Sequence, residues 1–407
     1  YIALKFWKST GLLYAIHNKE RDMIETLNQE FYFYEGQDNV GRNSGAYVFR
    51  PKHPTTKRVG LDAPVTVRVV KGPLVQEVHQ TFCPWVSQVV RLYKGAKYAE
   101  FQWIVGPIDT EDGQGKEVVS LFTSNLQNDR IFYTDSNGRE MLERVQDMRE
   151  TWDYRAVDPI SGNYYPVTSR IYIQDRRKDV QLSVVTDRPQ GGTSLGTGLL
   201  ELMVHRRLLR DDGLGVDEPL NDEGVDRNGI IFTGKHYVVL DTIANSAKLL
   251  RHLALQVHLE PTVMFTPVTD KKPGYKMMQQ QTFLTNPLPD NVHILTLDRI
   301  SANETNFYLL RLEHVYEADG PPESSAPAHV TLENLFKPFD IYWAEETTLG
   351  GNYSPDDVDR LQWTTNDGDL TDESINSPDF KPKMEPPFNI ILHPMEIRTF
   401  RVQIVKY

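Results

Sequence analysis

The stretch Val86-Ser-Gln-Val-Val-Arg-Leu-Tyr93 and its successor Tyr98-Ala-Glu-Phe-Gln-Trp-Ile-Val105 decide the fold class. Both are rich in β-branched and aromatic residues, and residues of alternate faces differ in polarity, as in a strand with one buried face. Further segments of this kind lie at Ala63–Val70, Arg170–Gln174, Val180–Thr186, His236–Leu240, Leu253–Leu259, Phe307–Leu312 and Ile397–Val405. The pattern predicts an all-β protein with several antiparallel sandwiches.

Helical patterns are scarce. The best helix candidate is Gly198–Leu209, in which Leu199, Leu202, Met203 and Leu209 would share one face, although the same residues equally fit a long strand. Asp135-Ser-Asn-Gly-Arg139 predicts a tight hairpin, because Asn-Gly tolerates the positive φ of a two-residue loop. Pro-, Gly- and acid-rich stretches predict loops at Asp109–Gly115, Asp211–Gly229, Asp319–Pro327 and Ser354–Pro387.

Composition narrows the class of protein. The 407 residues carry a net charge of −12, with 39% hydrophobic and 25% charged residues, which predicts folded domains without a nucleic-acid partner. No apolar run approaches the roughly 20 residues of a membrane helix, so we expect a soluble chain without a membrane span. The chain opens on Tyr1 in a strand-like run, without a signal peptide, and we expect it to be a piece of a longer precursor.

Metal-binding patterns are absent from the sequence. The single cysteine, Cys83, has no CxxC partner, and the eleven histidines form no HxH, HExxH or HxxxH spacing. His252 and His258 would share one face of a strand but lie roughly 20 Å apart. We therefore expect no zinc site made by this chain alone.

Three polar patterns have both a structural and a functional interpretation. Gly192-Thr-Ser-Leu-Gly196 spells the GxSxG of a nucleophile elbow around Ser194, but the chain lacks the parallel α/β context, so a glycine-rich strand connection is favoured. Asp211-Asp212 could be a pair of catalytic carboxylates, although paired acids in a Gly-rich loop are usually solvated. Arg206-Arg207 predicts either a structural ion pair, which is favoured on the residues alone, or a site for carboxylates or hydroxyls.

Two triplets fit the N-glycosylation pattern, at Asn303-Glu-Thr305 and Asn352-Tyr-Ser354. Pro355 follows the second triplet and weakens it. Together they favour a secretory route.

Several longer segments resemble the C-terminal half of the lysosomal α-mannosidases of glycoside hydrolase family 38. They include Ser44-Gly-Ala-Tyr-Val-Phe-Arg-Pro51, Lys71-Gly-Pro-Leu-Val-Gln-Glu-Val-His79, Phe132-Tyr-Thr-Asp-Ser-Asn-Gly-Arg-Glu140, Leu200-Glu-Leu-Met-Val-His-Arg-Arg-Leu-Leu209 and Pro394-Met-Glu-Ile-Arg-Thr-Phe400. The resemblance covers nearly the whole chain, in the family's order.

The resemblance implies a large antiparallel β-sandwich (galactose-mutarotase-like supersandwich) over residues 1–260, forming part of an active-site wall. One or more smaller β-sandwich domains would follow over 261–407, with the boundary near Pro261. It also implies a zinc-dependent retaining α-mannosidase that removes α-linked mannose from N-glycans in the lysosome, with secretion as an alternative. The zinc ligands and the nucleophile would lie in an N-terminal catalytic chain of the same precursor, so this chain alone would be inactive, with no catalytic residue or metal ligand of its own.

The same resemblance implies that the tyrosine of Gly-Ala-Tyr and one arginine of Arg-Arg-Leu reach the sugar. In this sequence these are Tyr47 and either Arg206 or Arg207 as substrate-binding residues. The partners would be the N-terminal catalytic chain and a mannose-containing glycan, and homo-oligomerisation is left open. A non-catalytic carbohydrate-binding or scaffold β-sandwich is the alternative function.

Overall fold

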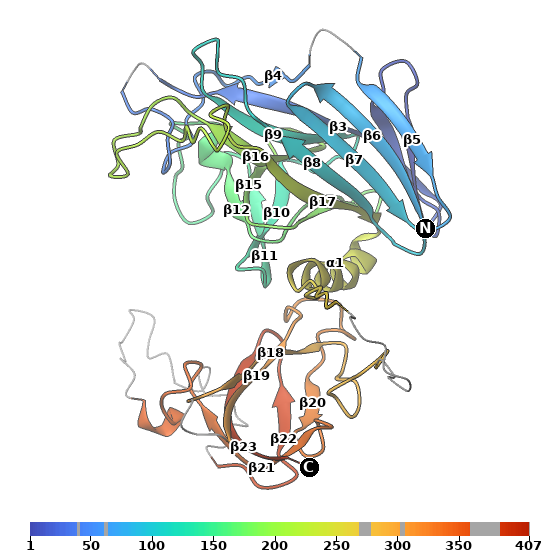
Figure 1. Ribbon diagram of the computed structural model, residues 1–407, viewed down its shortest axis with the longest axis vertical. Coiled ribbons are helices and arrows are strands. Elements are labelled where there is room, and N and C mark those ends of the chain that lie inside the picture. Colours follow the sequence, from blue (N-terminus) through green and yellow to red (C-terminus); the bar gives the residue numbers. More distant parts are fainter. Residues whose placement is uncertain (39–40, 61–63, 268–277, 302–305, 359–382, 407) are drawn as a thin grey trace. The chain divides into compact units, whose positions relative to one another are not determined.

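The computed structural model describes residues 1–406 except for 39–40, 61–63, 268–277, 302–305 and 359–382. The chain forms two compact units, Tyr1–Pro261 and Thr262–Tyr407, which are described separately (Figure 1). Antiparallel sheets make up both units, and the described residues contain one α-helix. The predicted all-β class is confirmed.

Unit 1 contains two sheets, in which every strand pairing is antiparallel. The first has the order β1 (Ile2–Phe6), β2 (Leu13–Asn18), β3 (Met23–Glu35), β9 (Lys116–Ser124), β16 (Leu199–Arg207), β15 (Gln190–Thr193) and β12 (Tyr165–Val167), with β4 (Lys57–Arg58) paired to β3. The second has the order β11 (Glu140–Val145), β10 (Ile131–Ser136), β13 (Arg170–Asp175), β14 (Val180–Thr186), β17 (Phe232–Asp241), β8 (Ala99–Val105), β7 (Val86–Tyr93), β6 (Val75–Cys83) and β5 (Thr66–Lys71).

The main core of unit 1 is formed by side chains of both sheets. Leu27 of β3 and Phe122 of β9 are buried in one cluster with Phe101 of β8 and Val238 of β17. The rings of Phe101 and Phe122 meet edge to face, with centroids 5.7 Å apart, which joins the two layers directly. Because side chains alternate along each strand, the first sheet has a second face that points away from this core.

The structure has a helix where the sequence predicts a strand. Leu253–Leu259 was predicted as a strand, but it lies in and just after α1 (Ile243–His258). Leu250, Leu253, Ala254 and Val257 form one helical face, which packs on Val185, Tyr237 and Val239 of the second sheet. His252 and His258 are exposed residues of this helix rather than of a strand.

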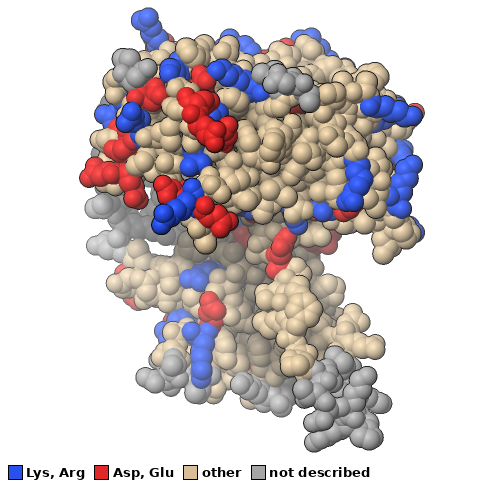
Figure 2. All heavy atoms as spheres, turned by 45° about the horizontal axis from the view of Figure 1, so that its top comes forward, with Lys and Arg blue, Asp and Glu red and all other residues tan. Residues whose placement is uncertain are grey.

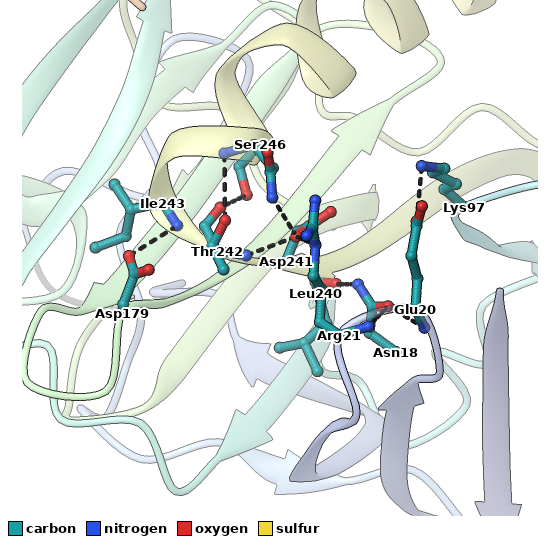
Figure 3. Close-up of polar contacts among 11 residues, drawn as sticks. Asn18, Glu20, Arg21, Lys97, Asp179, Leu240, Asp241, Thr242, Ile243 and Ser246 are labelled. Carbon is teal, nitrogen blue, oxygen red and sulfur yellow. Dashed lines mark hydrogen bonds and ion pairs between the residues drawn. The ribbon is translucent and has the colours of Figure 1, made fainter.

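The start of α1 is anchored to the sheet by short polar contacts (Figure 3). The Thr242 hydroxyl caps the helix by accepting from the N–H of Asn245, and Ser246 Oγ donates to the Thr242 carbonyl at 2.8 Å. Asp179, in the turn before β14, accepts from the N–H of Ile243. An N-cap threonine ahead of an amphipathic segment is the sequence signal for this helix.

Two local predictions are decided by the structure. Of the two alternatives for Gly198–Leu209, the strand is correct, because Leu199–Arg207 is β16, paired with β9 and β15. The hairpin is confirmed, but its loop has three residues rather than two. Ser136 of β10 pairs with Glu140 of β11 across Asn137, Gly138 and Arg139, and the φ values of Asn137 and Gly138 are 53° and 73°.

Unit 2 is a smaller β structure. Its four-stranded sheet has the order β18 (Val292–Arg299), β19 (Phe307–His314), β23 (Ile397–Lys406) and β21 (Phe339–Thr347), and β20 (Ala328–Thr331) pairs with β22 (Asn389–Leu392). Leu310, Ala344 and Phe400 of the larger sheet share one core with Val330 and Ile390 of the smaller one. No helix in the described residues has the length and apolar character needed to cross a membrane.

Candidate functional site

Three neighbouring strands bring Tyr34, Glu117 and Arg206 together on the outer face of the first sheet. Tyr34 of β3 and Arg206 of β16 both pair with Glu117 of the central strand β9. Directly paired residues place their side chains on the same face. Val118, the next residue on β9, points into a buried apolar cluster instead, so Glu117 lies on the opposite face.

The fully buried Glu117 forms an ion pair with the partly buried Arg206. Arg206 donates from Nε at 2.9 Å and from Nη2 at 2.6 Å to Glu117 Oε1, and Ser44 Oγ donates to the same oxygen at 2.8 Å. Burial raises the pKa of the Glu117 carboxyl above its ordinary value, although Arg206 and Ser44 act in the opposite direction. Arg206 Nη2 also donates to the carbonyl of Val48 at 3.0 Å. The pair therefore ties residues 44–48 to the sheet.

Asp212 holds the same segment from the other side. Its Oδ2 accepts from the backbone N–H of Tyr47 at 2.7 Å and of Val48 at 3.2 Å, while Oδ1 accepts from the N–H of Leu214. Asp212 is buried, and a side chain at Gly45 would have its Cβ 2.7 Å from this carboxylate. Asp212 is thus a structural clamp for the backbone of Tyr47, not a solvated loop acid.

Tyr47 and Arg206 line one groove of about 940 Å³. The backbone of Tyr47 is held in place, but its side chain is 66% exposed. Arg206 uses Nε and Nη2 for its contacts with protein, and no hydrogen bond of Nη1 is seen in the described part of the chain. An exposed phenol and a guanidinium with one uncommitted nitrogen are groups that can bind the hydroxyls of a ligand.

A second buried carboxylate lies under the groove. Glu201 of β16 accepts hydrogen bonds from the hydroxyls of Tyr34, at 2.9 Å, and of Tyr164. Burial raises the pKa of the Glu201 carboxyl and of both phenols. Phe49 packs edge to face between Tyr34 and Tyr164, and both Phe49 and Tyr164 line the groove. This network makes the groove floor rigid.

Arg207 has a different role from Arg206. Its Nε donates to Asn221 Oδ1 at 2.7 Å, and its Nη1 donates to the carbonyls of Ile108 and Asn228, both at 2.8 Å. It does not line the groove of Tyr47 but lies at a neighbouring pocket of about 600 Å³. Arg207 therefore joins the loop after β8 to the loop after β16. Acidic side chains, mixed with basic ones, gather on the side of unit 1 where these loops lie (Figure 2).

The residues that the structure describes are not arranged as a zinc site. In the described ranges, no cluster of three or more His, Cys, Asp or Glu side chains could hold a metal ion. Glu117 and Glu201, two buried carboxylates of the same sheet, are instead bound to arginine, serine and tyrosine. We therefore derive no chemical step through a metal on this chain.

The remaining sequence candidates lie elsewhere. Ser194 is buried in the connection from β15 to β16, which is strand to strand, so no nucleophile elbow forms. Asn352 is exposed in a turn of unit 2, where its Oδ1 accepts from Thr348 Oγ1. Asn303 lies outside the described residues.

Sequence reasoning missed Glu117, Glu201 and the clamp formed by Asp212. The first two lie in strands whose alternation predicts one polar face, but nothing in the sequence shows which polar residues a loop will cover. The sequence shows Asp211 and Asp212 only as adjacent acids. The structure separates the buried Asp212 from Asp211, whose Oδ2 accepts a local hydrogen bond from the N–H of Gly213.

Relatives of known structure and sequence agree with this architecture. An alpha-mannosidase from Enterococcus faecalis V583 superposes with a TM-score of 0.60 over 98% of this chain and 41% of its own, at 13% identity, which is a likeness of fold. Human "Lysosomal alpha-mannosidase" is 44% identical over 99% of this chain, and "Alpha-mannosidase" of Canavalia ensiformis is 35% identical over 99%. The chain spans 39% of the length of the human relative and 41% of the plant one.

Two domain families match the chain in order. "Glycosyl hydrolases family 38 C-terminal domain" matches residues 1–214, and "Glycosyl hydrolases family 38 C-terminal beta sandwich domain" matches residues 291–400. The first match covers more than half of the chain and includes Tyr47, Asp212 and the Glu117–Arg206 pair. The chain belongs to glycosyl hydrolase family 38 and corresponds to its C-terminal domains.

Proposed function

We propose that this chain is the C-terminal part of a zinc-dependent retaining α-mannosidase that removes α-linked mannose from N-glycans. Its relatives carry the name alpha-mannosidase, and the human one the name lysosomal alpha-mannosidase, which supports action in the lysosome, with secretion as an alternative. The zinc ligands and the nucleophile are proposed to lie on the N-terminal catalytic part of the same precursor, which would be the main partner of this chain. Further association into homo-oligomers is left open.

The groove of Tyr47 is the observation on which this proposal rests. In it, the exposed Tyr47 phenol can donate to or accept from a sugar hydroxyl, and Arg206 can donate from Nη1. Both act in binding and orienting the sugar, and neither is proposed to attack or protonate it. We assign the ligand contact to Arg206 rather than Arg207, because Arg206 lines the groove of Tyr47 and Arg207 does not.

Hydrolysis of p-nitrophenyl α-D-mannoside by the full-length protein tests this function. We expect hydrolysis, with α-mannose as the first product seen by NMR, because a retaining enzyme keeps the anomeric configuration through a glycosyl-enzyme. The β-mannoside is the matched control. An inactive full-length protein that still binds mannosides would instead support the non-catalytic carbohydrate-binding function, and substantial turnover by residues 1–407 alone would refute the proposed division of labour.

We also propose N-glycosylation at Asn352 and Asn303. The exposed turn of Asn352 supports the first site, since the acceptor must be reached by the transferase. Treatment of the secreted protein with peptide-N-glycosidase should increase gel mobility, and Asn352→Gln and Asn303→Gln should each remove one step of that shift. A variant that leaves the pattern of the wild type unchanged would exclude its site.

A further inference from the structure

The wall of the groove formed by residues 152–166 has no part in the function proposed above. Trp152 lines this wall, and its side chain is 60% exposed. Its ring meets that of Tyr154 edge to face, with centroids 5.4 Å apart and an interplanar angle of 74°. Two neighbouring aromatic rings exposed at a groove offer an apolar surface on which a ligand can stack.

The segment that carries Trp152 is held firmly. The guanidinium of Arg149 stacks 4.2 Å from the Tyr154 ring centroid and 5.2 Å from that of Tyr165, and its Nη2 donates to the Gly162 carbonyl. Asn163, which is fully buried, exchanges hydrogen bonds of 2.7 and 2.9 Å with Asp147. A rigid aromatic surface loses little conformational entropy when a ligand binds.

Charged groups lie beside this aromatic surface. Asp158 lines the groove and forms a half-exposed ion pair with Arg50 at 3.3 Å, and Arg155 lines the same wall. Pyranose rings have one face of C–H groups, which stacks on aromatic rings, and an edge of hydroxyls, which binds carboxylates and guanidinium groups. The volume of about 940 Å³ is near the upper end of small-molecule sites, roughly 300–1,000 Å³, and has room for more than one sugar.

We propose that Trp152, supported by Tyr154, stacks against a second sugar ring of an oligosaccharide whose terminal mannose lies at Tyr47. This inference rests on the proposed function and deepens it, since it makes Trp152 a residue that selects longer glycans over single mannosides. Binding energy from such a remote ring favours the longer substrate without any change in the reacting groups.

Calorimetric titration of the full-length protein tests the inference. The ligands are a hydrolysis-resistant, thio-linked α-mannotriose and methyl α-D-mannoside. We expect Trp152→Ala to weaken trisaccharide binding about tenfold, the loss of one aromatic stacking contact, and to change monosaccharide binding several-fold less. Trp152→Phe should restore part of the difference. Trp7→Ala is the matched control, because Trp7 is 55% exposed and stacks on Tyr14 rather than lining this groove.

Two results would overturn the inference. Equal losses for both ligands would place Trp152 at the terminal mannose or give it a structural role. Unchanged affinities, with a lower melting temperature, would mean that a polypeptide segment of the longer protein covers Trp152. The proposed function fails separately, when the full-length protein neither hydrolyses p-nitrophenyl α-D-mannoside nor binds either ligand.

Discussion

The carboxylate of Asp212 accepts a hydrogen bond of 2.7 Å from the backbone N–H of Tyr47, although the two residues lie 165 positions apart in the sequence. The loop after β3 and the loop after β16 are thereby joined at the residue proposed to reach the sugar. A buried carboxylate bound to backbone N–H groups holds a backbone more firmly than a side-chain contact would, because the N–H groups have fixed directions. The conformation of Tyr47 is consequently set by a residue that need not touch a ligand.

Asp212→Ala should therefore impair the enzyme by displacing Tyr47. Three N–H groups lose their acceptor, and each unsatisfied group costs about 1–3 kcal/mol unless water reaches it. We expect kcat to fall more than tenfold, and Asp212→Asn, which keeps an acceptor oxygen, to retain a larger share of it. The control is Asp211→Ala, which removes the same charge but only the local bond to Gly213. Equal effects of the two alanine variants would contradict the clamp.

Tyr47→Phe should slow turnover with little loss of stability. The phenol is largely exposed, so its hydroxyl adds little to folding, whereas one hydrogen bond in the transition state is worth about 10–100-fold in rate. Initial rates on p-nitrophenyl α-D-mannoside and the melting temperature of the full-length protein measure the two effects. Tyr353→Phe, at a similarly exposed tyrosine of unit 2, is the control. A melting temperature lowered in parallel with the rate would give Tyr47 a structural role.

Substitution of Arg207 should mainly lower the stability of the fold, whereas substitution of Arg206 should mainly weaken substrate binding. Arg207→Ala leaves Asn221 and two backbone carbonyls without their donor, so we expect a loss of about 2–3 kcal/mol in unfolding free energy. Arg206→Lys keeps a charge opposite Glu117 but loses the planar fork, and we expect it chiefly to raise KM. Urea unfolding measures the loss of stability, and steady-state kinetics measure the change in KM. Loss of substrate affinity confined to Arg207→Ala would reverse the assignment.

The sequence was sufficient to predict most strands and the Asn137–Gly138 turn, because these depend on local alternation and backbone preference. It failed at α1, where Leu253, Leu255, Val257 and Leu259 alternate as in a strand. The pairing of Glu117 with Arg206 depends on the register between β9 and β16, which are far apart in sequence. No local sequence pattern specifies the register between two strands so far apart. The family resemblance pointed to Tyr47, but only the structure shows that Arg206 lines the groove of Tyr47 and that Arg207 does not.

Glu117→Gln and Glu117→Ala should differ strongly. The glutamine oxygen can still accept from Arg206 and Ser44, whereas alanine leaves a largely buried guanidinium without its partner, which costs about 3–5 kcal/mol. Because burial raises the pKa of Glu117, the folded state binds this proton more tightly than the unfolded chain, and this group's stabilisation declines as pH rises through the raised pKa. Urea unfolding at several pH values should show the wild type losing stability relative to Glu117→Gln as pH rises. A constant difference would contradict the raised pKa.

His236 should make the protein sensitive to acid in the opposite sense. It is fully buried between Trp103 and Phe122, Nε2 lies 2.9 Å from Gln190 Oε1, and burial lowers its pKa from 6.5 to about 3. His236 therefore binds a proton near pH 6.5 in the unfolded chain, but only near pH 3 in the folded protein. Stabilisation by neutral His236 is complete above pH 6.5, and about 2 kcal/mol of it is lost between pH 7 and pH 5. Unfolding free energies of His236→Gln should lack that loss, whereas His258→Gln, at an exposed position of α1, should keep it. The same pH dependence in wild type and His236→Gln would show that His236 is not the group responsible.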